Sequence, residues 1–138
     1  MMQEGDALPT VEKSLSQQQI ESYARASGDF NPIHVDKEFA ARSQFGGTIA
    51  HGMMIAASIS EMMSLAFGPS WATGGHLKLR FKAPVRPGDS VTTSGKVKRV
   101  GRSDRGREIA CTVEVHRQTG EVAITGDATV TVRPSTGN

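Results

Sequence analysis

The stretch Gly52–Phe67, which reads GMMIAASISEMMSLAF, carries apolar or small side chains at nearly every position. Its apolar residues leave almost no polar face, and Gly68 with Pro69 marks the end of the run. A helix that is apolar on all sides is normally buried on all sides. We therefore expect the rest of the chain to be arranged around this helix.

The chain beyond this helix changes to the two-residue period of a β-strand. Leu77, Leu79 and Phe81 alternate with basic residues, and the segments that follow are rich in Val and Thr. Turn sequences separate these segments, which are Val91 to Val100, Glu108 to Arg117 and Val122 to Val132. One long apolar helix followed by a meander predicts an α+β architecture in which a curled antiparallel sheet wraps the helix.

The N-terminal third shows weaker signals. Val11 to Leu15 is compatible with a short edge strand, and Ser16 followed by Gln19 forms a capping-box pattern. Together with the stop signal at Gly28, this predicts a helix over Gln17 to Ser27. Asp36 to Arg42 reads as one or two helical turns, with Asp36 as the cap and Phe39 directed inward. No linker divides the chain, so we expect one domain over residues 1–138.

Composition excludes several classes of protein. The net charge is only +2, and 5% of residues are aromatic, too few for a basic surface with stacking aromatics that binds nucleic acid. No apolar run approaches the roughly 20 residues of a membrane span. Cys111 is the only cysteine and no apolar leader opens the chain, so we expect a cytoplasmic protein without an intramolecular disulfide.

The strongest motif for chemistry is Ser27-Gly28-Asp29-Phe30-Asn31-Pro32-Ile33-His34. Asp29 and His34 stand on either side of Pro32, which fixes its own φ and restricts Asn31, so the two functional ends have little freedom to drift. Taken singly, an Asp before an Asn-Pro turn is usually a turn-former and a lone His is usually structural. Their joint spacing with His51-Gly52-Met53 favours catalysis.

The run from Tyr23 to His34, with Ala40 after a five-residue gap, resembles the signature of the MaoC-like family of (R)-specific enoyl-CoA hydratases. The resemblance continues through His51-Gly52-Met53, Ser60 and Phe81-Lys82-Ala83-Pro84-Val85 to Pro87-Gly88-Asp89, and so covers nearly the whole chain in order. Ala26 departs from the pattern, since the family usually carries a larger apolar residue or Gly there. The resemblance implies the hot-dog fold and an acyl pocket near a subunit interface, which agrees with the homodimer that we expect from the low apolar content.

For this reaction, we expect Asp29 and His34 to hold the water that adds to the double bond. The unpaired backbone N–H groups at the start of the Gly52–Phe67 helix suit the thioester oxygen, and Gly52 is the candidate oxyanion donor. The matching family Gly contacts the thioester. We expect Asn31 to brace the turn or orient the water, and Ser60 matches a family position that lines the acyl pocket.

The other polar residues have simpler interpretations. His51 is expected to cap the helix or form a local hydrogen bond, and His76 and His116 to lie at the surface. Asp29, His34, Asp36 and His51 are possible metal ligands, but the sequence has no compact His-x-x-x-His or Cys-His set, so we expect no metal. Cys111 reads as a small buried residue. Lys78, Arg80, Lys82 and Arg86 read as a solvated strand face, with contact to coenzyme A phosphates as the alternative.

The sequence thus predicts a homodimeric lyase that hydrates trans-2-enoyl-CoA to (R)-3-hydroxyacyl-CoA, with coenzyme A as part of the substrate and no cofactor. The first alternative is a 3-hydroxyacyl dehydratase acting on acyl-carrier-protein thioesters, since the same residues serve both. A non-catalytic acyl-thioester-binding module would have lost the acid or base, whereas Asp29 and His34 are both present. A thioesterase is a further alternative, disfavoured because the signature is that of the hydratases.

Overall fold

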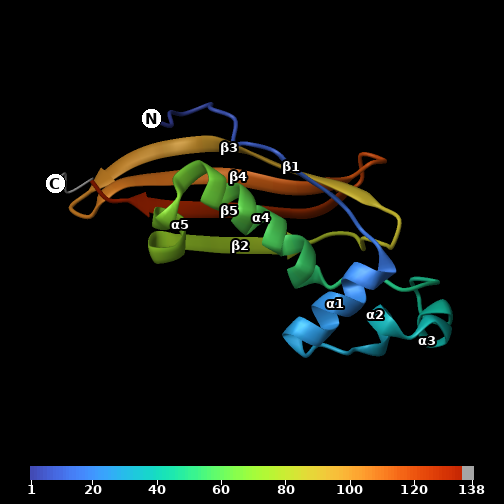
Figure 1. Cartoon of the computed structure of the whole chain (residues 1–138). Coiled ribbons are helices and arrows are strands. Elements are labelled where there is room, and N and C mark those ends of the chain that lie inside the picture. Colours follow the sequence, from blue (N-terminus) through green and yellow to red (C-terminus); the bar gives the residue numbers. More distant parts are fainter. Residues whose placement is uncertain (135–138) are drawn as a thin grey trace.

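The computed structural model describes residues 1–134 and places the helix α4 (Gly52–Phe67) along one face of a five-stranded antiparallel sheet (Figure 1). The sheet has the order β1-β3-β4-β5-β2, so that β1 and β2 form its two edges. Its strands are β1 (Val11–Ser14), β2 (Gly75–Phe81), β3 (Ser90–Ser103), β4 (Gly106–Arg117) and β5 (Val122–Val132). The predicted α+β class and the long helix over Gly52–Phe67 are confirmed.

The core lies between α4 and the sheet face that it covers. Ile55, Ile59, Met62 and Met63 of α4 are buried. The strands contribute small and β-branched side chains to the same cluster, among them Val97, Cys111, Val113, Ala128 and Val130. Alternate residues of a strand point to the same face, which is why the apolar positions of the three long strands meet the helix. Cys111 is buried as predicted.

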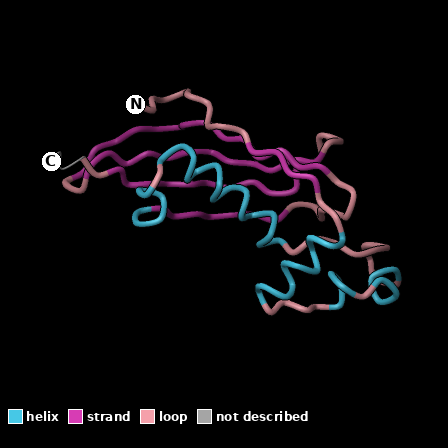
Figure 2. Tube along the Cα trace, in the orientation of Figure 1, coloured by secondary structure: helices cyan, strands magenta, loops and turns pink. Residues whose placement is uncertain are grey.

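The opposite face of α4 is not covered, and here the expectation of burial on all sides is wrong for the single chain. Met53 is 64% exposed and Leu65 is 65% exposed, and Ala57 lies on the exposed face with them. The helices appear on only one side of the sheet in Figure 2. A single sheet can cover only one face of a helix, so the apolar outer face remains open to solvent in one copy of the chain.

Helix α1 (Gln17–Ser27) has the bounds that the sequence predicts. The Ser16 hydroxyl accepts a hydrogen bond from the Gln19 backbone N–H at 3.1 Å, and the Gln19 side chain accepts one from the Ser16 N–H at 2.8 Å. Gly28 ends the helix with φ of 79°, a left-handed conformation that Gly adopts without a steric penalty. The capping box and the Gly stop together fix where the Asp29–His34 motif begins.

The short helices differ from the predictions in two respects. The Asn31-Pro32 turn continues into α2 (Pro32–Val35), which is followed by α3 (Lys37–Ala41) with Asp36 as its cap. Phe39 of α3 does not point inward as expected but is 51% exposed, because this five-residue helix buries only Ala40. After Gly68 the chain forms α5 (Pro69–Gly74), since Pro at the first helical position loses no hydrogen bond.

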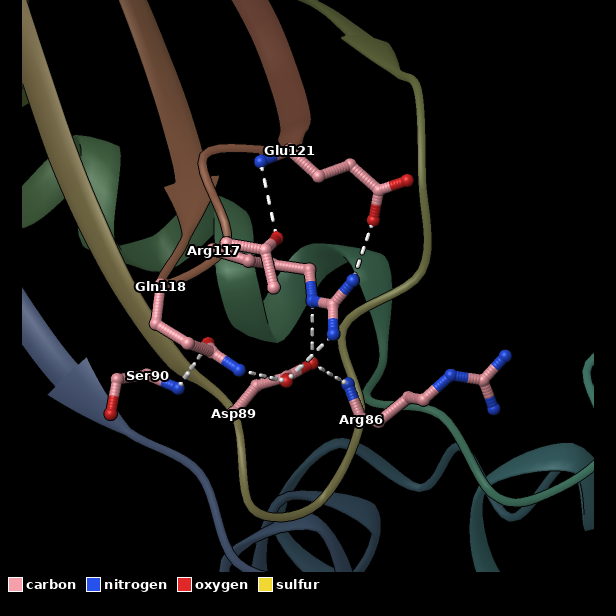
Figure 3. Close-up of polar contacts among 7 residues, drawn as sticks. Arg86, Asp89, Ser90, Arg117, Gln118 and Glu121 are labelled. Atoms are coloured by element: carbon pink, nitrogen blue, oxygen red, sulfur yellow. Dashed lines mark hydrogen bonds and ion pairs between the residues drawn. The ribbon is translucent and has the colours of Figure 1, made fainter.

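The buried carboxylate of Asp89 holds the turn before β3. Its oxygens accept hydrogen bonds from the Arg117 Nε at 2.9 Å, from the Gln118 side chain at 2.8 Å and from the Arg86 backbone N–H at 2.8 Å (Figure 3). The Asp89 carbonyl also accepts from the Leu15 N–H at 2.8 Å. This turn therefore ties the β4–β5 hairpin to the segment that leads into α1.

No helix within residues 1–134 is long and apolar enough to cross a membrane.

Candidate active site

The motif Asp29–His34 lies beside the N-terminal end of α4, where α1 ends and α2 begins. Asn31 has φ of −54° and ψ of 129°, the extended conformation expected before Pro32. Its side chain accepts a hydrogen bond from the Ile33 N–H at 3.1 Å and so caps α2. Asn31 therefore braces the turn, which is one of its two expected roles.

Asp29 is exposed, and its carboxylate is only lightly engaged. Oδ1 accepts one hydrogen bond, from the Asn31 N–H at 3.2 Å, and within residues 1–134 no other donor reaches the carboxylate. An ionised carboxylate has acceptor positions on both oxygens. Most of the acceptor capacity of Asp29 is therefore available to a water molecule or a substrate.

His34 is buried except for 9% of its surface, and one of its two ring nitrogens is committed. Nδ1 lies 2.8 Å from the Ile49 carbonyl oxygen. A carbonyl can only accept, so Nδ1 carries a proton, and in the neutral imidazole Nε2 is left as an acceptor. The turn therefore presents two acceptors, the Asp29 carboxylate and His34 Nε2.

Gly52 begins α4 next to these two side chains. Within the described part of the chain, the backbone N–H groups of Gly52 and Met53 donate to no protein acceptor, and His51 provides no side-chain cap. The positive end of the helix dipole adds to these free donors. A Cβ at Gly52 would lie 2.8 Å from Cε1 of Phe81, so Gly is the residue that leaves this corner open.

Two cavities meet at Gly52 and Phe81. One, of about 290 Å³, is lined by His34 and by apolar residues that include Ile55 and Ile124. The other, of about 410 Å³, contains Asp29. A ligand placed across Gly52 would therefore lie within reach of both acceptors.

His51 lies against the Asp29–His34 pair, whereas the sequence predicted a helix cap or a local hydrogen bond for it. Its side chain forms no cap for α4 and is 98% buried, with 2% exposed. Nε2 lies 2.9 Å from the Asp29 carbonyl oxygen, and the ring stacks on His34 with centroids 3.8 Å apart. The contact spans 22 positions of the sequence, so local spacing gave no signal for it. Only the position of His51 directly before Gly52 pointed to the site.

Comparison with known proteins identifies the family and the fold of this chain. The family model described as "MaoC like domain" matches residues 3–119. This chain belongs to the MaoC-like family. The hot-dog fold implied by the sequence is confirmed, because an (R)-hydratase from A. caviae involved in PHA biosynthesis superposes with a TM-score of 0.82 at 31% identity, covering 95% of this chain and 97% of that structure.

Curated relatives of this MaoC-like protein carry names of two kinds. A "3-hydroxybutyryl-CoA dehydratase" of Methylorubrum extorquens is 36% identical over 88% of this chain and 76% of its own length. An "(R)-specific enoyl-CoA hydratase" of Rhodospirillum rubrum is 35% identical over 89% of this chain and 83% of its own length. Hydratase and dehydratase describe the two directions of one reaction.

The site also contains a set of donors that could be taken for metal ligands. One ligand atom from each of Asp29, His34 and His51 lies within 4.8 Å of the others, so the structure brings together three of the four residues that the sequence offered as possible metal ligands. The two rings are stacked at 26° between planes, however, and imidazole lone pairs lie in the ring plane. The lone pairs of the two rings therefore lie in nearly parallel, separate planes, which does not suit coordination of one ion by both rings. This arrangement suits acid–base chemistry better than metal binding.

Of the remaining predicted residues of this MaoC-like protein, only Lys82 borders a cavity that contains Asp29 or His34. Ser60 accepts a hydrogen bond from Nε1 of Trp71 in α5 at 3.3 Å and borders neither of the two cavities. Lys82 borders the cavity that contains His34, whereas Lys78 and Arg80 are exposed along β2. The side chain of Arg86 points away from Asp89 in Figure 3.

Proposed function

We propose that this protein reversibly hydrates trans-2-enoyl-CoA to (R)-3-hydroxyacyl-CoA. The observation that carries the proposal is the pair of free acceptors, the Asp29 carboxylate and His34 Nε2, beside the unpaired N–H of Gly52. The names of the family relatives support the same reaction.

The separation of the two side chains suits a single bridging water. A carboxylate oxygen of Asp29 lies within 4.8 Å of a ring nitrogen of His34, and a water hydrogen-bonded to two acceptors spans up to about twice the ~2.8 Å of an O–H···O bond. A water between Asp29 and His34 would donate both hydrogens and direct its lone pairs away from them. Those lone pairs would face a substrate lying over Gly52.

In the hydration step, the water oxygen forms a bond to C3 while Asp29 or His34 takes its proton. The C2–C3 π electrons move toward the thioester carbonyl, and the charge that develops on its oxygen is stabilised by the Gly52 N–H and the helix dipole. The proton is then delivered to C2. Every atom of the water is used, and dehydration follows the same path in reverse without a cofactor.

The apolar walls around His34 suit the acyl part of a thioester. Carrier recognition lies outside these contacts, so the first alternative is a dehydratase acting on acyl-carrier-protein thioesters. Lys82, at the border of the His34 cavity, is the basic residue best placed to meet a coenzyme A phosphate. We propose a cytoplasmic location, in keeping with a single buried thiol.

The open apolar face of α4 and the outer edge of strand β2, which pairs only with β5 within residues 1–134, support a homodimer. Both are features that a soluble protein normally covers. Light scattering at micromolar concentration should return at least the mass of a dimer. A monomer at that concentration would contradict the proposal.

Ser60 is proposed to line the acyl pocket once a second copy covers α4. A larger side chain should then shorten the preferred substrate, so that Ser60→Leu lowers the turnover of octenoyl-CoA relative to crotonyl-CoA. Ser60→Thr, which keeps the hydroxyl that accepts from Trp71, is the matched control. An unchanged ratio in Ser60→Leu would remove Ser60 from the pocket.

The direct test is hydration of crotonyl-CoA, followed through the loss of enoyl absorbance, with the product analysed on a chiral column. We expect the (R)-alcohol. The same assay with a crotonyl acyl-carrier protein compares the two carriers. An (S)-product, or no turnover of either thioester, would overturn the proposed function.

A further inference from the structure

We propose that His51 is a positioning residue that holds Asp29 in register with His34 and Gly52. The inference rests on the proposed function, because it gives His51 a role in the same reaction. His51 is placed to act through Asp29 and His34, because neither of its ring nitrogens is accessible to a substrate. Its Nε2 is bound to the Asp29 carbonyl, and its Nδ1 is buried without a partner among residues 1–134.

Three hydrogen bonds join the segment before α4 to the catalytic turn. The Ile49 N–H donates to the Ile33 carbonyl at 3.2 Å, and the Ile49 carbonyl accepts from His34 Nδ1 at 2.8 Å. Both of these hold the His34 end of the turn. The contact from His51 to the Asp29 carbonyl, at 2.9 Å, is the one that reaches the Asp29 end.

The Asp29 end has little other support. Asp29 and Phe30 are exposed, and the hydrogen bonds of this stretch are to the neighbouring residues Ser27 and Asn31. Contacts this local fix the shape of the turn but not its distance from α4. His51 immediately precedes Gly52, so its side chain sets the position of the Asp29 backbone relative to the oxyanion donor.

The stacked rings add a second constraint. His51 packs against His34 on one side, with ring centroids 3.8 Å apart, and against Tyr23 with ring centroids 4.7 Å apart.

The stacked rings of His34 and His51 each donate a hydrogen bond to a backbone carbonyl, but through different ring nitrogens. His51 therefore carries its proton on Nε2, whereas His34 carries its proton on Nδ1.

Two substitutions test separately the contribution of the hydrogen bond from His51 to Asp29 and that of the His51 ring. His51→Phe keeps a flat ring but has no donor, while His51→Gln keeps an N–H at similar reach without the ring. We expect His51→Phe to lower kcat by about 10- to 100-fold with KM within about twofold, the range for a misplaced catalytic group. His51→Gln should recover part of that loss. His116→Gln, a half-buried histidine on β4, is the control.

Coupling to Asp29 distinguishes positioning from general support of the fold. If His51 acts through Asp29, adding His51→Phe to Asp29→Asn should lower kcat by less than threefold beyond Asp29→Asn alone. Wild-type kcat in His51→Phe, multiplicative losses in the double variant, or a His51→Gln enzyme no better than His51→Phe would each overturn the proposal.

The tautomers can be measured on the unaltered protein, so the inference stays testable if His51→Phe does not fold. Nitrogen-15 NMR of labelled histidine should show His51 protonated on Nε2 and His34 on Nδ1. A proton on Nδ1 of His51 alone would overturn the proposed contact. If crotonyl-CoA is not hydrated, the proposed function fails, whereas the NMR result still decides where His51 donates.

Discussion

Asp29 and Asp89 are both aspartates in turns, yet their surroundings are opposite. Asp29 is exposed, and its carboxylate accepts a single hydrogen bond from a nearby backbone N–H. Asp89 is 5% exposed and is surrounded by donors from Arg86, Arg117 and Gln118 (Figure 3). One carboxylate is left open, and the other is fully engaged.

Asp29 is therefore available for chemistry, whereas Asp89 stabilises the fold. Burial raises the pKa of Asp89, but the hydrogen bonds from Arg117, Gln118 and the Arg86 N–H, together with the charge of Arg117, bring it below its usual value. Such a carboxylate has no acceptor position left for a water. Asp29 has several, and it lies beside His34 and the start of α4.

The largest expected effect concerns the open carboxylate. Asp29→Asn keeps the shape but removes the proton acceptor, and His34→Ala removes its partner. Either change should lower the turnover of crotonyl-CoA by about 10² to 10⁴-fold while leaving thermal stability nearly unchanged. Steady-state kinetics and thermal melts of the same preparations measure the two quantities separately.

Asp36→Asn is the matched control, since Asp36 is also exposed and caps α3 through the Phe39 N–H. Asn caps a helix about as well as Asp, so this variant should retain both activity and stability. Because Asp29 and His34 act on one water, the double variant should be little worse than the worse single one. Near-normal turnover in Asp29→Asn would show that the open carboxylate is not catalytic.

A second prediction concerns Gly52, where the two cavities of the site meet beside Phe81. Gly52→Ala places a methyl group 2.8 Å from the Phe81 ring, which is exposed enough to shift. The N–H remains, so turnover should fall by about 10- to 100-fold, less than the 10² to 10³-fold cost of losing an oxyanion donor. Stability should not fall, because Ala is a better helix former than Gly.

Gly101→Ala is the control for this substitution. Gly101 lies on β3, far from the site, and the atom nearest to an added Cβ would be the Glu108 carbonyl oxygen of β4, 4.0 Å away. Turnover of Gly52→Ala equal to that of Gly101→Ala would mean that the substrate does not approach this corner.

Much of this arrangement could be predicted from local sequence signals. The capping box at Ser16 and the stop at Gly28 fixed the bounds of α1, and the apolar run fixed those of α4. The spacing of Asp29 and His34 across Pro32 indicated the pair. Each of these signals lies within one element or one turn, which is why the sequence alone carried them.

The features that were missed depend on contacts between distant segments. His51 was expected to cap the helix or form a local hydrogen bond, because nothing in its neighbourhood indicates a bond to Asp29. The exposed face of α4 and the orientation of Phe39 depend on how much surface a single sheet and a five-residue helix can cover. The engagement of Asp89 by Arg117 joins residues 28 positions apart.

A third prediction concerns the engaged carboxylate. Asp89→Asn leaves the partly buried guanidinium of Arg117 without its main charged acceptor, since Glu121 reaches only Nη1. We expect the free energy of unfolding to fall by about 2 kcal/mol. This is less than the cost of breaking a fully buried ion pair, because Arg117 retains some exposure. Denaturant melts at one protein concentration measure it. Asp104→Asn in the exposed β3–β4 turn should change stability much less, and equal losses in both variants would contradict the assignment.

The smallest effect is a dependence on pH that follows from the same carboxylate. Because the pKa of Asp89 is lowered by folding, its contribution to stability is fully present above its unfolded pKa of about 3.9 and is lost as the pH falls through the folded value. Asp89→Asn carries no group that titrates at this position. Its free energy of unfolding should therefore lie well below that of the wild type at pH 7, and the gap should narrow below about pH 4.

Denaturant melts of the two proteins at pH 7, 5, 4 and 3 measure this gap directly. Other carboxylates, including Asp29, are present in both proteins, so their titration cancels in the difference between them. A gap that stays constant from pH 7 to pH 3 would show that Asp89 stabilises the turn through the shape of its side chain rather than through its charge. If the difference in free energy of unfolding disappears in acid, the negative charge of Asp89 stabilises the turn, whereas the carboxylate of Asp29 is left open.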